Sequence, residues 1–294
     1  MPKNENCLAD KRVLVCIPNY GTAQLRHTVR QLEALNQAKL SVDVIFHTTH
    51  PLPIEYPNLR LTNVVVSSDL GEHIPWLHRR VMAEQLHNYD LFVYAENDIL
   101  IEAANLAAFL ELDAILPPGT LAGFLRFEFA EGDSANRYLP DAHGDYPVFE
   151  SLETHGGELF FSIRNKFQSS FVLTRAHLQL ALQSGAFLRA PGEYNVYGLV
   201  ESAATDVYVL CGLHKVLSFP RLESLLVRHL SDKYANLTYG IWARKPHTVE
   251  SLRQLVRDAS TTRSHWAIPQ ITDSAQYKHP AEPTNDEQCF HAPP

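Results

Sequence analysis

The first 116 residues alternate short apolar runs with amphipathic segments, and this alternation constrains the fold more than any other feature of the sequence. Apolar runs of strand length occupy residues 13–18, 42–47, 61–66 and 89–101. Apolar residues at helical spacing follow the first, third and fourth of these runs. The order predicts an α/β protein with a mainly parallel, Rossmann-like sheet flanked by helices, whose ligands bind at the carboxyl ends of the strands.

The rest of the chain is less regular. Residues 130–160 are rich in Gly, Asp, Pro and aromatic side chains and predict a long functional loop. We expect one domain over residues 11–270, in two halves at 11–116 and 117–270, with polar tails at 1–10 and 271–294. Strands and helices of the second half are expected at 121–129, 167–173, 175–183, 201–211, 216–219 and 224–228.

Composition narrows the classes of protein that this chain can belong to. With 294 residues, of which 45% are hydrophobic, the chain can bury a sizeable core. A formal net charge of −8 argues against sequence-independent nucleic-acid binding. No run approaches the roughly 20 apolar residues of a transmembrane segment, and the polar start lacks a signal-peptide core. We therefore expect a cytoplasmic protein, for which peripheral membrane association through a partner or surface patch remains compatible.

Glu96-Asn97-Asp98 interrupts the apolar run of residues 89–101. Three consecutive polar residues inside a buried strand destabilise a fold by several kcal/mol unless they are satisfied. Two carboxylates two positions apart at a strand end suit a hard divalent cation. A plain turn is the alternative, because Asn-Asp is common in turns. The return of apolar residues at 99–101 favours metal or donor binding over the turn.

The segment YDLFVYAENDILI resembles the DxD-bearing strand of GT-A glycosyltransferases, with Glu96 in the first acidic position. The run VLVCIPNYG resembles the opening strand of the same family. This resemblance implies a GT-A fold and transfer of a sugar from a nucleotide-sugar donor to a saccharide or other hydroxyl acceptor. It implies that Mn²⁺ or Mg²⁺ bridges the donor diphosphate, with Asp98 as a direct ligand and Glu96 on the metal or the ribose. Residues 11–116 would then bind the nucleotide, and residues 117–270 the acceptor.

The resemblance also assigns donor-binding residues in the first half. They follow the opening strand, the third strand and the DxD-like motif, or lie on the helix expected at 71–87. A solvated face is the alternative for Arg79, and a helix cap is the alternative for Asp69. The donor-binding candidates are Pro18, Asn19, Tyr20, Asp69, Arg79, Glu96 and Asn97.

Two downstream segments complete the resemblance. His229, in VRHLS, matches a C-terminal histidine that serves many GT-A enzymes as a third metal ligand. Because the chain has 15 histidines, an ordinary solvated or core histidine is the alternative. Lys233 and Tyr234 follow it and are candidates for contact with the diphosphate.

The second segment, TDVYV, resembles the EDVYV string of galactosyltransferase-like and fringe-like enzymes, whose Asp is the catalytic base. Asp206 matches that string, whereas Glu201 stands at the start of the expected helix, where a cap is the alternative function. Five residues turn a helix by about 500°, so these two carboxylates point roughly 140° apart. One of them is expected to be the base of an inverting transfer, with position favouring Glu201.

Two other functions fit parts of the pattern. A nucleotidyltransferase shares a Rossmann-like sheet with paired acids, but its opening loop is usually Gly-rich and basic, unlike Pro18-Asn19-Tyr20-Gly21. A non-catalytic nucleotide- or carbohydrate-binding module on a degenerate transferase fold is the other alternative. The acids at positions 96, 98, 201 and 206 argue against such degeneracy.

Overall fold

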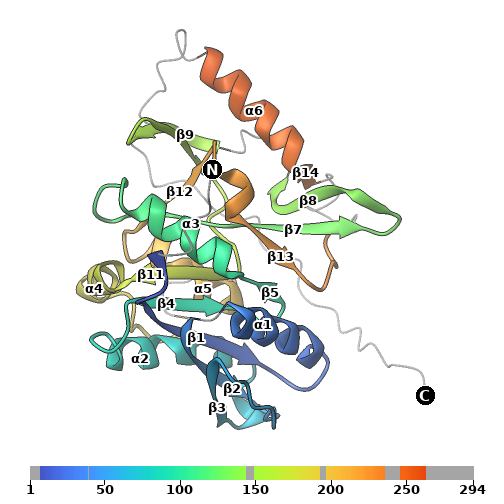
Figure 1. Ribbon diagram of the computed structural model, residues 1–294, viewed down its shortest axis with the longest axis vertical. Helices are drawn as coiled ribbons and strands as arrows, with labels where there is room; N and C mark the ends of the chain where they lie inside the picture. The colour runs from blue at the N-terminus through green and yellow to red at the C-terminus, as the bar shows by residue number, and fades with distance from the viewer. Residues whose placement is uncertain (1–6, 39, 144–148, 193–196, 236–245, 263–294) are drawn as a thin grey trace.

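The computed structural model describes residues 7–38, 40–143, 149–192, 197–235 and 246–262 (Figure 1). The chain forms an α/β fold with two five-stranded sheets and one four-stranded sheet among these residues. The expected tail at 271–294 and most of the tail at 1–10 lie outside the described residues. None of the helices in the described ranges is both long and apolar enough to cross a membrane.

The first sheet has the strand order β11-β4-β1-β2-β3. Its neighbouring pairs β1–β2, β2–β3 and β1–β4 are parallel, and β11 is antiparallel to β4. The mainly parallel sheet expected from the first half is thereby confirmed. Its strands are β1 (Arg12–Asn19), β2 (Ser41–Thr48), β3 (Leu59–Val65), β4 (Leu91–Ala95) and β11 (Ser170–Thr174).

Helices cover both faces of this sheet. Consecutive residues of its central strands are accordingly buried, at 13–19 in β1 and throughout β4. Gln31 and Leu35 of α1 (Leu25–Gln37) line a cavity with Val93 of β4. His78 of α2 (Leu77–Glu84) packs on the ring of Tyr94, the next residue of β4, with centroids 4.2 Å apart. Successive strand residues point to opposite faces, so α1 and α2 lie on opposite sides of the sheet.

The strand expected over residues 89–101 is in fact two strands in different sheets. β4 ends at Ala95, and β5 (Ile99–Leu100) pairs with β13 (Leu226–His229) in a separate sheet. Glu96, Asn97 and Asp98 form the turn that connects them, with the Ile99 amide donating to the Glu96 carbonyl at 3.0 Å. The single-strand prediction was wrong because both apolar runs are buried, but in different layers.

The helix expected at 71–87 is also shorter than predicted. Residues Ser68–Trp76 form the 3₁₀ segment η2, and α2 begins only at Leu77. Gly71 interrupts the helical backbone with φ 45° and ψ −122°, and Pro75 lacks the amide hydrogen that a continuing α-helix needs. The chain therefore bends before α2.

The long loop predicted at 130–160 was wrong. The described residues of this region form β8 (Asp133–His143), β9 (Phe149–His155) and β10 (Glu158–Ile163). Gly156 and Gly157, with φ of 55° and 80°, make the two-residue turn between β9 and β10. Positive φ at both central residues is typical of a tight hairpin, so the glycines indicated a hairpin rather than a loop.

The second half of the chain supplies the remaining layers. The four-stranded sheet has the order β6-β12-β10-β9, and the other five-stranded sheet has the order β14-β8-β7-β13-β5. The strand expected at 121–129 is divided between these two sheets, as β6 and β7. The elements not yet defined are α3 (Ala103–Asp113), β6 (Thr120–Ala122), β7 (Leu125–Ala130), α4 (Arg175–Gln183), α5 (Leu199–Val209), β12 (His214–Ser218), η3 (Leu222–Leu225), β14 (Pro246–Thr248) and α6 (Val249–Thr262).

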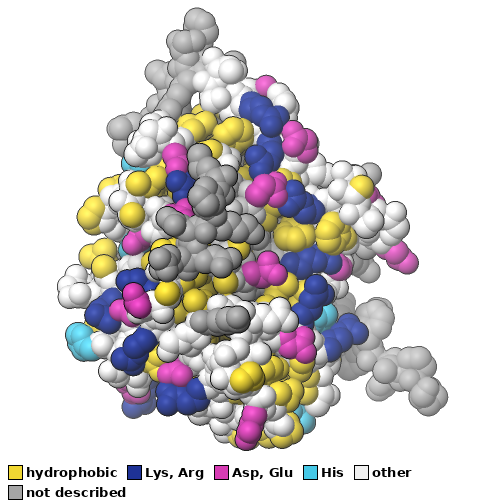
Figure 2. All heavy atoms as spheres, viewed as in Figure 1, with side chains coloured by type: hydrophobic (Ala, Val, Ile, Leu, Met, Phe, Trp, Pro, Cys, Tyr) yellow, Lys and Arg dark blue, Asp and Glu magenta, His cyan; other side chains and the backbone are white. Residues whose placement is uncertain are grey.

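The surface over α6 and the strands beneath it carries interspersed basic and acidic side chains (Figure 2). Arg257 of α6 lies 3.0 Å from Glu250, and Arg253 lies 2.9 Å from Glu223 of η3. Arg137 of β8 reaches the same glutamate at 2.7 Å. Ion pairs at such exposed positions contribute little to stability, so the layers are held mainly by their buried apolar side chains.

Candidate functional site

The turn after β4 is held in place by backbone hydrogen bonds to two distant segments. The amide of Glu96 donates to the carbonyl of Ser169 at 3.0 Å, just before β11. The amide of Leu230, just after β13, donates to the carbonyl of Asp98 at 2.8 Å. Ser169 is fully buried and has a positive φ of 53°, unusual for a residue other than glycine. The polar motif is thus fixed where both five-stranded sheets meet.

Asp98 and His229 lie side by side although 131 positions separate them in the sequence. His229 Nε2 is 3.0 Å from Asp98 Oδ2, and both side chains are buried. Their proximity follows from topology, because His229 pairs with Ile99 in the β5–β13 ladder. The structure therefore brings together two of the three predicted metal ligands.

A glutamate that the sequence analysis missed binds the other side of the imidazole. His229 Nδ1 hydrogen-bonds Glu128 Oε1, and Glu128 is completely buried in β7. Glu128 Oε2 accepts from the amides of Tyr234 at 2.8 Å and Ala235 at 2.5 Å. The signal was present in the string LRFEFA, where a carboxylate occupies an otherwise apolar strand.

Two carboxylates, one on each ring nitrogen, favour the imidazolium form of His229. Burial alone lowers the pKa of His229, but its hydrogen bonds with Asp98 and Glu128 outweigh burial and raise it. Burial likewise raises the pKa of Asp98, yet hydrogen bonding to His229 reverses the direction and lowers it. The imidazole of His229 is therefore held between the carboxyl groups of Asp98 and Glu128.

Glu96 is the third predicted metal ligand, and its surroundings differ from those of Asp98. Its Oε1 atom is buried without a hydrogen-bond partner in the part of the chain that the structure describes. Burial raises the pKa of Glu96 to about 7, and the neighbouring Arg126 limits that rise. Arg126 is itself committed to Asp141, through bonds of 2.8 and 2.6 Å, and to Ser169 Oγ at 2.8 Å.

The candidate nucleotide-binding residues gather at the carboxyl ends of β1, β2 and β4. Asn97 Nδ2 donates to Asn19 Oδ1 at 2.8 Å, and Asn19 Nδ2 donates to Thr48 Oγ1 at 3.0 Å. Pro18 is buried in β1, whereas the next residue after the strand, Tyr20, is 59% exposed. Hydrogen bonds therefore connect the carboxyl ends of these three parallel strands beside the exposed ring of Tyr20.

Asp69 stands beyond the end of β3, in the first turn of η2. The hydroxyl of Ser67 caps this segment by accepting from the Asp69 amide at 3.2 Å. The same hydroxyl lies 3.1 Å from Asp69 Oδ2, and Asp69 is exposed. Ser67, rather than Asp69, therefore caps this segment, and Asp69 follows the end of β3 as an exposed carboxylate.

Arg79 and Asp206 form a buried ion pair, with Arg79 Nη2 3.2 Å from Asp206 Oδ2. Arg79 also donates to the carbonyl of Ser202 at 2.9 Å, and its guanidinium lies 3.9 Å from the ring centroid of Trp76. Both charged side chains are only 3% exposed. This arrangement joins α2 to α5 and favours a structural function for both residues.

Glu201 occupies the first turn of α5 and is half-buried. Its carboxylate folds back over the residue before the helix, since a Cβ placed on Gly198 would lie 2.4 Å from Glu201 Oε2. Lys233 is exposed, and its ammonium lies 4.8 Å from the ring centroid of Tyr234. The ring of Tyr234 in turn stacks on His229, with centroids 5.5 Å apart.

Asp98 and His229 are a pair of potential ligands rather than a complete metal cage. Within the described ranges, no group of three or more His, Cys, Asp or Glu side chains is arranged to hold a metal ion. Comparison with protein families finds no family model that matches the chain. No curated protein matches it significantly either, so the functional argument depends on the site itself.

Proposed function

We propose that this protein is a divalent-metal-dependent glycosyltransferase of the GT-A type, which moves a sugar from a nucleotide-sugar donor to a hydroxyl acceptor. The observation that carries the proposal is the contact between Asp98 and His229 at the carboxyl end of β4. Ligands of open, mainly parallel sheets bind at that edge. The strand order around β1 and the polar residues after β1, β2 and β4 support the same location.

The chemistry of the donor set fits Mn²⁺ or Mg²⁺. Asp98 supplies a carboxylate oxygen and His229 an imidazole nitrogen, and Glu128 holds the far nitrogen of the ring as outer carboxylates do for metal-binding histidines. Such cations are commonly held by one or two protein ligands together with substrate phosphates and water. The metal would stabilise the negative charge that develops on the leaving diphosphate.

The remaining candidates divide between donor and acceptor. Tyr20 offers an exposed ring for the nucleotide base, and Asp69 offers a carboxylate for the ribose. Lys233, whose charge influences both Asp98 and Glu96, can balance the diphosphate. Asn19 and Asn97 hold the edge in shape through their mutual hydrogen bond.

Transfer with inversion requires one proton acceptor on the acceptor side. In the proposed reaction, Glu201 removes the hydroxyl proton while the acceptor oxygen bonds to the anomeric carbon. The bond from that carbon to the donor phosphate oxygen breaks, and its electron pair leaves with the nucleoside diphosphate. Glu201 is preferred to Asp206 because it is half-buried, whereas Asp206 is paired with Arg79 inside the protein.

The test is a panel of nucleotide-sugars, each with and without Mn²⁺, read first by thermal shift and then by donor hydrolysis. A ligand that binds only the folded protein raises its apparent stability by mass action. We expect one nucleotide-sugar to stabilise the protein only with Mn²⁺, and slow release of the nucleoside diphosphate from that donor. Binding without turnover would indicate a binding module. Stabilisation by nucleoside triphosphates alone would indicate a nucleotidyltransferase.

A further inference from the structure

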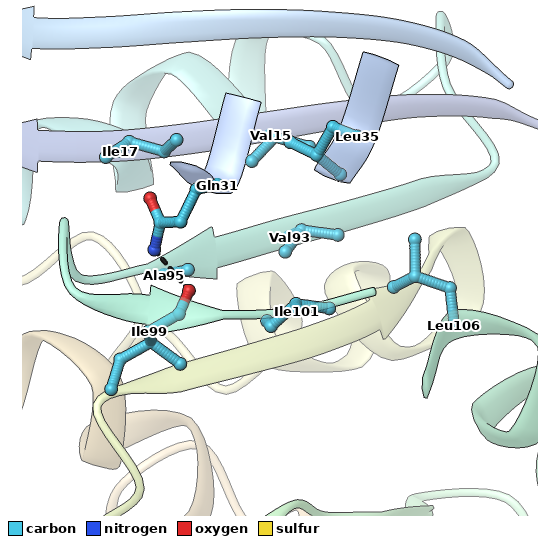
Figure 3. A pocket seen from close by; sticks show the side chains of 9 residues that line it. All are labelled: Val15, Ile17, Gln31, Leu35, Val93, Ala95, Ile99, Ile101 and Leu106. Atoms are coloured by element: carbon cyan, nitrogen blue, oxygen red, sulfur yellow. Dashed lines mark hydrogen bonds between the residues drawn. The ribbon is translucent and has the colours of Figure 1, made fainter. Parts of the chain in front are cut away.

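One polar side chain lies in an otherwise apolar cavity directly beneath the turn that carries Asp98. Gln31 of α1 enters it among aliphatic side chains of β1, β4 and β5, and Figure 3 shows its amide directed at the chain near Ile99. Its walls are otherwise apolar and include Val15, Leu35, Val93 and Ile99.

The amide nitrogen of Gln31 bridges the two ends of the turn. Gln31 Nε2 donates to the carbonyl of Glu96 at 2.6 Å and also to the carbonyl of Ile99. These two carbonyls flank Asn97 and Asp98, so both hydrogens of one amide group close the turn from below. The bridge comes from a helix 65 positions earlier in the chain.

The other end of the same amide is left unsatisfied. Gln31 Oε1 is buried with no hydrogen-bond partner among the described residues, and Gln31 as a whole is only 3% exposed. An unsatisfied buried acceptor destabilises a fold by roughly 1–3 kcal/mol. An aliphatic residue would suit the apolar walls of the cavity better. A glutamine at this position is therefore explained by what its nitrogen does for the turn, rather than by packing.

We propose that Gln31 is a positioning residue that fixes the turn 96–99, so that the Asp98 carboxylate faces His229. This inference rests on the proposed function for its catalytic meaning, because the turn presents the candidate metal ligand. Without the bridge, the Asp98 carboxylate samples more orientations, and the metal must select among them. Affinity then falls in proportion to the fraction of the protein that has the competent arrangement.

The test compares Gln31→Met with Leu35→Ala in the full-length protein. Gln31→Met fills the space and removes both donors, whereas Leu35→Ala alters the same cavity from the same helix without touching the turn. Peptide-level hydrogen exchange measures residues 96–101 against 13–18 of β1. Titration with Mn²⁺ alone, followed by electron paramagnetic resonance, measures metal affinity.

We expect Gln31→Met to accelerate exchange over residues 96–101 and to weaken Mn²⁺ binding, each by about tenfold, which corresponds to about 1.4 kcal/mol. Leu35→Ala should lower overall stability without either effect. Gln31→Glu, which offers at most one donor, should give intermediate values, and it replaces Gln31→Met if that variant does not fold. A residue that only fills space would not give effects that grow with the number of hydrogen-bond donors removed.

Three results would overturn the proposal: unchanged exchange over residues 96–101 in Gln31→Met, equal acceleration in Leu35→Ala, or faster exchange with unaltered Mn²⁺ affinity. A native protein that binds no Mn²⁺ would remove the metal from the proposed function instead. In that case the exchange measurement alone decides whether Gln31 holds the turn.

Discussion

Two buried pairs of charged residues join the first half of the chain to the second, and they differ in what the basic partner can do. Asp98 contacts His229, which lies 131 positions later in the sequence, and Arg79 contacts Asp206, which lies 127 positions later. An imidazole can give up a proton and bind a metal instead, whereas a guanidinium stays charged and cannot coordinate one. Under the proposed function the first pair gives up its proton to a metal ion, whereas the second pair holds two helices together.

The surroundings of the two pairs agree with this difference. Asp98 lies in the turn at the carboxyl end of β4, near the exposed Lys233. Arg79 is enclosed by Trp76 and the carbonyls of α5, and Asp206 Oδ1 has no partner among the described residues. Similar acids in similar apolar strings thus serve a candidate site in one place and packing in the other.

Removing the charge of Asp98 is the strongest test of this distinction. Asp98→Asn keeps an oxygen that can accept from His229 but removes the anionic ligand. We expect a loss of about 10³-fold in metal-dependent turnover, because a bound metal contributes several kcal/mol of charge stabilisation. Stability should fall by less than about 2 kcal/mol. Turnover at limiting Mn²⁺ and urea unfolding measure the two quantities, with Asp206→Asn as the matched buried-acid control.

Near-native turnover of Asp98→Asn at limiting Mn²⁺ would refute a metal site at this turn. If Asp206→Asn instead lost its metal-dependent turnover, Asp206 and Arg79 would belong to the metal site, and Asp98 and His229 would be structural.

Breaking the second pair should affect stability rather than chemistry. Arg79→Met leaves the buried carboxylate of Asp206 without its partner, which typically destabilises a protein by about 3–5 kcal/mol. Adding Asp206→Asn should recover part of that loss, because the unpaired charge is then removed. Urea unfolding measures the stability, and kcat for each folded molecule should stay within about twofold. An increase in donor KM with unchanged stability would restore Arg79 to the diphosphate site.

Lys215 is a buried basic residue outside both pairs. Unlike Arg79, it can lose its charge when it is buried. Burial lowers the pKa of Lys215 to about 7 in the folded protein, and its ammonium donates to the Lys166 carbonyl at 2.9 Å. Between pH 7 and 10.5 the unfolded chain holds this proton and the folded chain does not, so stability rises with pH over that window.

We expect native protein to gain about 4 kcal/mol relative to Lys215→Met on going from pH 6 to pH 10. Comparing unfolding free energies of the two proteins at each pH cancels the titration of other groups. A pH-independent difference would mean that Lys215 stays charged inside the fold.

The next largest effect separates the two candidate bases. Glu201→Gln should slow turnover by about 10²-fold with donor affinity nearly intact, in line with general-base contributions. Asp206→Asn should change turnover little, because that carboxylate is already paired with Arg79. The reverse result would make Asp206 the base. If neither variant slows transfer, no side-chain base acts here, and retention becomes the better mechanism.

Sequence periodicity predicted the parallel sheet because its strands are locally encoded as buried apolar runs. It placed β1 and β2 to within a residue or two, and it matched α4 at residues 175–183. It could not show that residues 89–101 divide between two sheets. A buried strand has the same apolar pattern whichever sheet it joins. Nor could it show which groups Glu128 and Gln31 bind, because their partners lie far away in sequence. Local patterns encode burial, but only the fold determines which buried polar groups meet.

The smallest predicted effect compares two neighbours at the end of β1. Asn19 is 2% exposed and hydrogen-bonds Asn97 and Thr48, whereas Tyr20 is 59% exposed. Tyr20→Ala removes an exposed ring and should change stability by less than about 0.5 kcal/mol. It should weaken donor binding by about five- to tenfold, near the lower end of what stacking of an aromatic side chain on a base contributes.

Asn19→Ala is the informative partner of this variant, because it breaks the connection between the ends of β1, β2 and β4. It should therefore weaken donor binding and lower the unfolding free energy together. Calorimetric titration with the donor, and separately with the acceptor, distinguishes the two residues. Equal losses of donor and acceptor affinity in Tyr20→Ala would indicate a folding defect. A loss confined to the donor would place the nucleotide base at Tyr20, on the exposed side of the edge where β1, β2 and β4 end.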